Sequence, residues 1–175
     1  DLPKFEEIYF PNKTESADFI KFIQELQKTV HFINLSLSDI ASHYMPLLRE
    51  YSARDIYKLY QNSGDVFLLP ALLKSAREWS ASSPNDADSW DFAGLALMEL
   101  ARPEKALINF EHALAIDSNH KYAAIGKGAC LIRLDRIAES IEWLNRISQQ
   151  NSDDYCKYVL SDAYLFAGFP QISYI

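Results

Sequence analysis

Six side chains in this chain are thiols or imidazoles, which can bind transition metals or act as nucleophiles and general bases. Thiolates and imidazoles hold zinc when several converge, and structural sites usually pair ligands about two to four residues apart. The two cysteines lie far apart, and no histidine shows metal-ligand spacing with a thiol or carboxylate. We therefore predict buried free thiols and surface or helix-capping imidazoles. The positions are His31, His43, His112, His120, Cys130 and Cys156.

Motifs that carry catalysis or hold cofactors are missing from the sequence. It contains no Gly-rich phosphate loop, no Gly-x-Ser-x-Gly and no His-Glu-x-x-His. We therefore expect no catalytic residue, no cofactor and no bound metal within these residues. Whether the chain belongs to an enzyme stays open, with the balance against it.

The charge of the chain argues against two classes of partner. The formal net charge is -7, the pI is about 5.0, and Lys and Arg are scattered. A surface that tracks phosphates needs clustered cations, so we expect neither nucleic acid nor an anionic membrane as a partner. No stretch approaches the ~20 apolar residues of a membrane span. We expect a cytoplasmic protein.

Apolar and small residues recur at a spacing of thirty-four along the chain. A fixed period in this range predicts stacked supersecondary units, whose default role is binding. The matching pairs are Trp90 and Ala124, Gly94 and Gly128, Leu97 and Leu131, Ala106 and Ser140, Leu107 and Ile141, Phe110 and Leu144, and Ala113 and Ile147.

Each unit has the pattern of two short helices. Apolar residues at helical spacing predict helices over 88–100 and 104–116 in the first unit, and over 121–134 and 137–148 in the second. Gly94 removes a side chain where a partner helix comes close, Ala106 offers a small facing surface, and Phe110 fills the space beside them. The turn residues Asp117-Ser118-Asn119 are expected to supply the N-cap of the next unit.

The first unit resembles a tetratricopeptide repeat, whose pattern is Trp-x2-Leu-Gly-x2-Tyr, then Ala-x3-Phe, another small residue and a Pro in the closing turn. Matching residues are Trp90, Gly94, Ala106, Phe110 and Ala113, whereas Ala93, Leu97 and Ser118 depart from the pattern. The resemblance implies an all-α helical-repeat solenoid of antiparallel helix pairs. The expected units are 53–86 (degenerate), 87–120, 121–154 and 155–175 (partial).

Residues 1–52 carry a different pattern, and we expect an N-terminal arm and a helical hairpin there. Apolar residues from Phe19 to Tyr51 alternate at spacings of four and three, which is a heptad seam. A helix start at Ser36-Leu37-Ser38-Asp39 and an interruption at Pro46 favour a hairpin packed on the first repeat. A homodimer through the seam is the alternative. Its contact residues would be Phe19, Ile23, Leu26, Val30 and Ile33.

In tetratricopeptide arrays the first helix of each pair lines a concave groove, so the resemblance implies a partner site there. Some family members hold a peptide carboxylate with Lys and Asn on this face, and those residues are missing here. The face is apolar with an acidic edge, which suits a hydrophobic peptide; filling by the chain's own N-terminal residues is the alternative. The groove residues are Asp88, Asp91, Phe92, Leu95, Met98, Tyr122, Ile125, Ala129, Ile132, Val159, Ala163 and Phe166.

Three functions remain open at this point. The leading hypothesis is a protein–protein interaction module, an adaptor or scaffold that binds an apolar peptide or partner segment in the groove. The second is a dimeric chaperone, similar in architecture to the translocator chaperones of type III secretion. The third is the N-terminal part of a larger enzyme, such as a transferase. The chain begins at Asp1 and stops at Ile175, as a fragment would.

Overall fold

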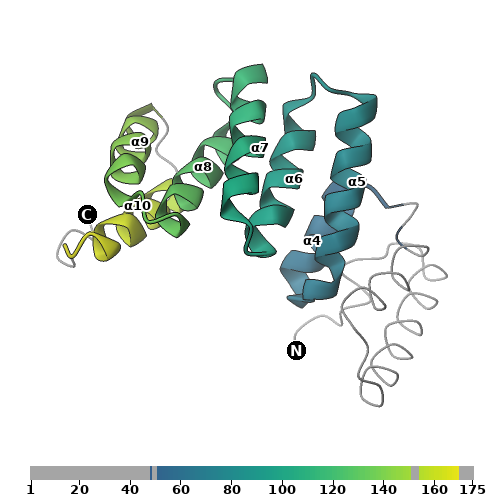
Figure 1. Ribbon diagram of the computed structural model, residues 1–175, viewed down its shortest axis with the longest axis horizontal. Helices are drawn as coiled ribbons and strands as arrows, with labels where there is room; N and C mark the ends of the chain where they lie inside the picture. Colours follow the sequence, from purple (N-terminus) through teal and green to yellow (C-terminus); the bar gives the residue numbers. More distant parts are fainter. Residues whose placement is uncertain (1–47, 49–50, 151–153, 170–175) are drawn as a thin grey trace, which may run out of the picture. The chain divides into compact units, whose positions relative to one another are not determined.

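The computed structural model describes residues 48, 51–150 and 154–169 of the chain, and most of them are helical (Figure 1). No strand occurs in these ranges. The elements, in chain order, are α4 (Ala53–Ser63), the short 3-10 helix η1 (Val66–Leu68), α5 (Leu69–Ser82), α6 (Ala87–Glu99), α7 (Pro103–Ile116), α8 (Lys121–Arg133), α9 (Ile137–Gln150) and α10 (Asp154–Phe166).

Consecutive helices pack in pairs, and the pairs stack in chain order. Each helix contacts the next along the chain, and α4, α6, α8 and α10 also contact one another in succession. The first helices of the pairs therefore form one layer, and the second helices α5, α7 and α9 lie against it (Figure 1). This arrangement confirms the prediction of an all-α helical-repeat solenoid. The predicted N-terminal arm and hairpin lie outside the described residues.

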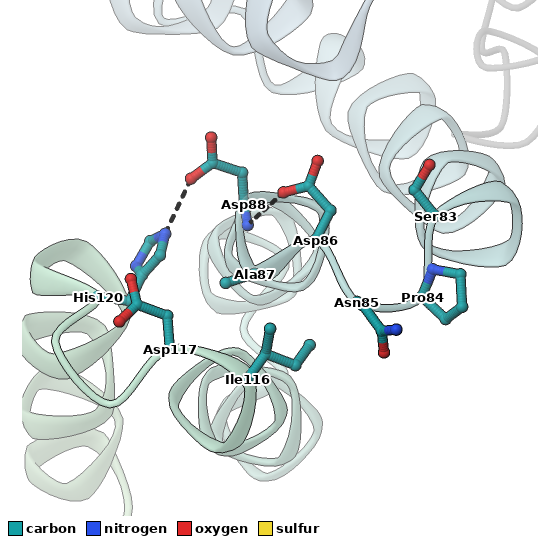
Figure 2. Close-up of a pocket in the computed structure, with 9 residues that line it drawn as sticks. All are labelled: Ser83, Pro84, Asn85, Asp86, Ala87, Asp88, Ile116, Asp117 and His120. Carbon is teal, nitrogen blue, oxygen red and sulfur yellow. Dashed lines mark hydrogen bonds and ion pairs between the residues drawn. The ribbon is translucent and has the colours of Figure 1, made fainter.

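The first helices begin at polar caps spaced by thirty-four residues. Ser52 accepts a hydrogen bond from the Asp55 amide, Asp86 from the Asp88 amide, and the His120 ring from the Ala123 amide, each at 3.2 Å. These bonds satisfy amides that the first turn leaves without a helical partner. Figure 2 shows Asp86 and His120 at the ends of α6 and α8. His120 therefore takes the capping role that the sequence assigned to the turn before it.

The turns inside the pairs show that the repeat shortens by one residue. Backbone φ is positive at Ala101 (54°), at Asp135 (59°) and at Gly168 (84°), so the interval is thirty-four residues and then thirty-three. The helix starts at Ala87, Lys121 and Asp154 follow the same intervals. Every position in α10 is therefore one residue earlier than the thirty-four-residue period predicts.

Phe110 on α7 is the wedge that joins two successive repeats. Its side chain is fully buried, and its ring lies directly over Gly94 of α6 and Gly126 of α8. A Cβ added at Gly94 would lie 2.7 Å from this ring, and one at Gly126 would lie 2.6 Å from it. The close approach of Gly94 confirms the sequence argument, whereas the part played by Gly126 was not predicted.

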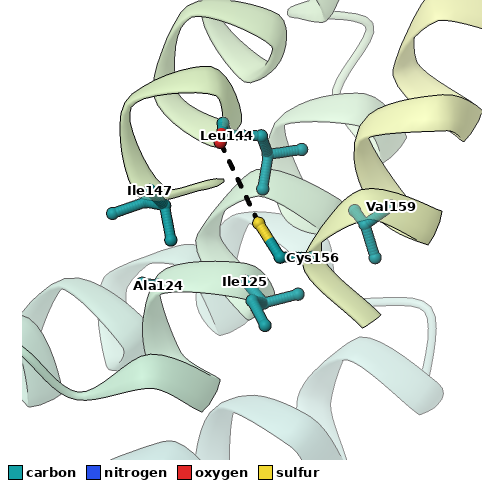
Figure 3. Packing of buried hydrophobic residues seen from close by; sticks show 6 residues of the cluster. All are labelled: Ala124, Ile125, Leu144, Ile147, Cys156 and Val159. Carbon is teal, nitrogen blue, oxygen red and sulfur yellow. Dashed lines mark hydrogen bonds between the residues drawn. The ribbon is translucent and has the colours of Figure 1, made fainter. Parts of the chain in front are cut away.

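The next repeat closes around Leu144, which takes the position of Phe110. Leu144 lies so close to Gly128 that an added Cβ would meet it at 2.5 Å. Figure 3 shows Leu144 in a cluster with Ala124, Ile125, Ile147, Cys156 and Val159, which joins α8, α9 and α10. Ser140 replaces the small Ala of the pattern, and its buried hydroxyl donates to the Gly128 carbonyl at 2.8 Å. This bond offsets the cost of burying the hydroxyl.

Both cysteines are buried free thiols, as predicted. Burial raises the pKa of Cys130 to about 12, so this thiol stays protonated and unreactive at neutral pH. Its sulfur lies 3.5 Å from the sulfur of Met98. The cysteines therefore contribute to packing between helices.

We expect Gly126→Ala to lower the free energy of unfolding by about 1–3 kcal/mol, because the added methyl overpacks a buried site. The better helix propensity of Ala, worth about 1 kcal/mol, would by itself have the opposite sign. Urea unfolding of both chains followed by circular dichroism measures the difference. Exposed Ala115→Gly on α7 reports the propensity effect alone. A Gly126→Ala chain as stable as the wild type would show that Phe110 has room to move.

Candidate functional site

The predicted groove residues of α6 divide into surface and interior positions. Asp88 and Leu95 are half-buried, whereas Asp91 (4% exposed) and Met98 (6%) are buried. Phe92 packs between two aromatic rings, edge-on to Tyr57 at 5.6 Å and stacked on Trp79 at 6.1 Å between centroids. Phe92 therefore joins α4, α5 and α6, with part of its surface left exposed.

On α8 the predicted residues again alternate in exposure. Tyr122 is 60% exposed, and Ala129 and Ile132 are half-buried. Ile125 is only 1% exposed and belongs to the cluster in Figure 3. The surface that α8 offers to a ligand is thus made by Tyr122, Ala129 and Ile132.

On α10 two of the three predicted groove residues are buried. Val159 is 5% exposed and Ala163 is fully buried, so the surface positions assigned to them are corrected. Counting thirty-three residues from α8 places Tyr155, Tyr158, Asp162 and Leu165 at the positions of Tyr122, Ile125, Ala129 and Ile132. Tyr155, Tyr158 and Leu165 are exposed and Asp162 is half-buried, whereas Phe166, at the position of Arg133, is 72% exposed.

We call the surface of the first helices at these positions the inner face. It combines large apolar and aromatic side chains from α6, α8 and α10, the first helices of three successive repeats. Its members are Asp88, Leu95, Tyr122, Ala129, Ile132, Tyr155, Tyr158, Asp162, Leu165 and Phe166.

A group of tyrosines and charges that sequence reasoning missed borders the inner face. Tyr60 donates a hydrogen bond to Glu99 Oε2 at 2.8 Å. Burial, and then this bond, raises the pKa of Tyr60 to about 12. Burial also raises the pKa of Tyr57 to about 12, with further contributions from Tyr155, Asp91 and Glu99. Both phenols therefore remain protonated donors at neutral pH. They lie on α4, whose degenerate repeat gave no signal for them.

A row of ion pairs links the starts of α4, α6 and α8, which are the first helices of three successive repeats. Arg54 of α4 donates to Asp88 Oδ2 at 2.6 Å, and Asp88 Oδ1 lies 2.9 Å from His120 Nε2 (Figure 2). The Nδ1 atom of His120 accepts the Ala123 amide, so the ring proton belongs on Nε2, where it is donated to Asp88. The Asp88 carboxylate thus pairs with one residue from each neighbouring repeat.

Asp91 lies one turn after Asp88 and is a buried acid without compensation. Its Oδ1 has no hydrogen-bond partner. Burial raises the pKa of Asp91 to about 7; the charge of Asp88 raises it further and that of His120 lowers it. An acid in this state exchanges its proton near neutral pH.

An open pocket of about 690 Å³ lies beside these ion-paired residues, at the loops that precede α6 and α8 (Figure 2). Asp86, Asp88 and Asp117 line it together with His120. Within the part of the chain that the structure describes, no three His, Cys, Asp or Glu side chains are arranged to hold a metal ion. The acidic side chains here cap helices and make ion pairs.

Two further observations concern the remaining predictions. Among the described helices, none has both the length and the apolar character needed to cross a bilayer. The predicted dimer residues Phe19, Ile23, Leu26, Val30 and Ile33 lie outside the described residues, and the homodimer stays a prediction.

Comparison with known sequences identifies the repeats. A sequence profile of the tetratricopeptide repeat matches residues 97–162. No curated protein matches the chain at the significance that we required.

Solved structures with the same fold are tetratricopeptide-repeat proteins. TTC0263, a thermophilic protein of Thermus thermophilus, has a TM-score of 0.62 and 14% identity over 76% of this chain and 75% of its own. The second such domain of human RPAP3, solved with the HSP70 peptide SGPTIEEVD, has a TM-score of 0.56 and 14% identity over 67% and 97%. YrrB, described as having an unusual peptide-binding site, has a TM-score of 0.54 and 15% identity over 91% and 78%.

Proposed function

Because this chain carries tetratricopeptide repeats, we propose that it is a protein-interaction module whose inner face binds an apolar segment of a partner protein. The observation that carries the proposal is the exposure of large apolar side chains along one face. Tyr122 is 60% exposed, Tyr158 62% and Phe166 72%. Contiguous exposed apolar surface on a folded protein is typical of interaction sites.

The half-buried residues of the inner face give this surface its floor. Leu95, Ala129 and Ile132 come from α6 and α8 and lie between the exposed tyrosines and the core. A partner side chain that covers them removes apolar area from water, which contributes about 25 cal/mol per Å² before ordering costs. An extended or helical segment can reach several of these positions at once.

Two of the similar structures support the choice of a peptide as the ligand. The RPAP3 domain is described in complex with an HSP70 peptide, and YrrB is described as having a peptide-binding site. The fold that this chain shares with them is thus one that holds peptides in at least two proteins. Their ligands are not transferred to this chain, because the identities are 14% and 15%.

The test is a pair of charge substitutions in the inner face. We expect Leu95→Glu combined with Ile132→Glu to abolish recovery of partner proteins by the tagged chain, measured by quantitative mass spectrometry. Carboxylates placed in an apolar contact must be desolvated, which costs several kcal/mol when they remain unpaired. The helical circular dichroism signal should change little, because both side chains are only half-buried.

The matched control is Ile108→Glu, which introduces the same charge on the second helix α7 at a side chain that is 55% exposed. It should leave partner recovery unchanged. If the double variant retains its partners, the inner face is not the binding surface. If the double variant unfolds, Leu95 and Ile132 act as core residues and do not form part of a binding surface, which contradicts the proposal.

A further inference from the structure

The inner face and the residues next to it carry more acidic than basic side chains. Asp88, Asp91 and Glu99 come from α6, and Asp162 comes from α10. Opposed to them are Arg54, which is paired with Asp88, and Arg133, whose Nη1 donates to the Met98 carbonyl at 3.0 Å. The described part of this surface is therefore acidic on balance, in keeping with the net charge of -7.

Asp91 differs from the other described carboxylates because one of its oxygens is buried without a hydrogen-bond partner. It is 4% exposed, and its Oδ1 accepts no hydrogen bond. An uncompensated buried carboxyl is costly, and the cost persists only where something else requires the group. The neighbouring carboxylate of Asp88, by contrast, is matched on both oxygens.

The repeat register relates Asp91 to one residue in each of the other first helices. The same position in the other first helices is Tyr57 in α4, Ile125 in α8 and Tyr158 in α10. At Tyr158, which no further described helix covers, this position is 62% exposed. In α6 the position is buried, and Tyr57 of α4 and His120 at the start of α8 are near enough to interact electrostatically with Asp91. Asp91 therefore lies beneath the inner face, one turn after Asp88 and one turn before Leu95 in α6.

We propose that Asp91 is the recognition site for a Lys or Arg side chain of the segment bound on the inner face. This inference rests on the proposed function and adds the chemistry of one ligand position. A cation inserted between the exposed tyrosines would supply the hydrogen bonds that the carboxyl lacks. Charge-assisted bonds of this kind are roughly twice as strong as neutral ones. The tyrosine rings beside it would also favour a cation.

The surroundings of Asp91 give this binding a pH dependence. Burial, above all, raises the pKa of Asp91 to about 7, so its proton must leave before a cation can pair with it. Lys and Arg remain charged throughout this range. The groups that interact electrostatically with Asp91 are His120 at the start of α8, Asp88 on its own helix, which is paired with Arg54, and Tyr57 on α4. Affinity for the cation should therefore rise between pH 6 and pH 8.

The experiment uses five synthetic peptide pools and the full chain. Each pool has a fixed central residue, which is Lys, Arg, Nε-acetyl-Lys, norleucine or Glu, and degenerate flanks of Leu, Ala, Tyr, Gln and Ser with blocked ends. Fluorescence anisotropy at pH 8 gives the affinities. We expect the Lys and Arg pools to bind about tenfold more tightly than the norleucine pool, as one desolvated charge pair allows. The acetyl-Lys pool should match norleucine.

Asp91→Asn should reduce the preference for Lys to less than about threefold while leaving the affinity for the norleucine pool unchanged. Asp162→Asn removes a different carboxylate of the inner face and should keep most of the preference. If both variants lose it equally, the effect is general electrostatic attraction and the assignment of Asp91 is overturned.

Wild-type results separate this inference from the proposed function. If the Lys and norleucine pools bind equally, the cation site is refuted while the peptide-binding face stands. If no pool binds, both are refuted. Asp91→Asn must also lose the rise in Lys-pool affinity between pH 6 and pH 8; an unchanged rise would contradict the inference.

Discussion

Replacing Phe110 by Ala is expected to lower the free energy of unfolding by about 3–5 kcal/mol, the usual cost of removing a fully buried aromatic ring. The ring is 0% exposed and lies against Gly94 of one repeat and Gly126 of the next. Its loss therefore opens a cavity within one helix pair and at the interface with its neighbour. Urea unfolding followed by circular dichroism measures the effect as a lower midpoint.

A nearby substitution on the same helix provides the comparison. Ile108 lies two residues before Phe110 on α7 but is 55% exposed, so Ile108→Ala should cost less than about 1 kcal/mol. If the two substitutions cost the same, Phe110 is not the wedge between repeats. In a repeat protein the neighbour interfaces set the cooperativity of unfolding. Phe110→Ala should therefore also broaden the transition, which a reduced m-value would report.

The coupling between Phe110 and its glycines follows from the same geometry. Because the atoms nearest to an added Cβ at Gly126 belong to the Phe110 ring, removing the ring relieves the closest contacts. The two substitutions should therefore be strongly non-additive, as expected for residues that share one cavity.

The fold was predictable because its determinants are local and recur. Gly94, Ala106 and Phe110 occupy fixed positions in a helix pair, and their sizes can be read without knowing the rest of the chain. The same pattern at Gly128 and Leu144 tolerates Ser140, whose hydroxyl finds the Gly128 carbonyl. A repeated small-to-large contact thus predicts helix pairs even where single residues depart from the pattern.

The limits of prediction lie where the repeat changes by one residue. The turn at Gly168 comes thirty-three residues after the turn at Asp135, and α10 already begins thirty-three residues after α8, so one residue is missing before α10 and every position on that helix is shifted. Ala163 consequently takes a core position, and Tyr155 takes the exposed position of Tyr122. A one-residue error is small along the chain but turns a helix by about 100°.

The electrostatics of the inner face could not be predicted, because they depend on contacts between repeats. Asp88 meets Arg54 thirty-four residues earlier and His120 thirty-two residues later. The sequence predicts Asp91 in the groove, whereas the structure buries it among the neighbours that pack around it. The sequence pattern predicts which helix carries this acid, whereas its raised pKa depends on the packing of neighbouring repeats.

We expect Asp91→Asn to change how stability depends on pH. The folded-state pKa of Asp91 is raised from 3.8 to about 7, chiefly by burial. The folded chain therefore holds this proton more tightly than the unfolded chain does. By linkage, the contribution of Asp91 to the free energy of unfolding is at its full value below about pH 4, falls as the pH rises toward 7, and stays low above that. Asn cannot ionise, so the variant lacks this loss.

The measurement is the difference in unfolding free energy between Asp91→Asn and the wild type at pH 4 and at pH 8. The pKa of Asp91 is about three units higher in the folded chain, and each unit corresponds to about 1.4 kcal/mol, so the upper limit of the effect is near 4 kcal/mol. Between pH 4 and pH 8 we expect the difference in unfolding free energy to change by about 2–4 kcal/mol in favour of the variant. Comparing two pH values cancels the cost of burying the Asn amide, which is the same at both.

High salt then separates the causes of the raised pKa. A cost that arises from burial is not removed by counterions, whereas a contribution from partly exposed Asp88 is screened. We therefore expect most of the difference to persist in about 1 M NaCl, where the screening length is only about 3 Å. Parallel stability curves for the two chains would contradict the raised pKa, and a difference that vanished in salt would assign it to Asp88. A difference that persists would identify the floor of the inner face as a site where the fold accepts a charge that it does not itself neutralise.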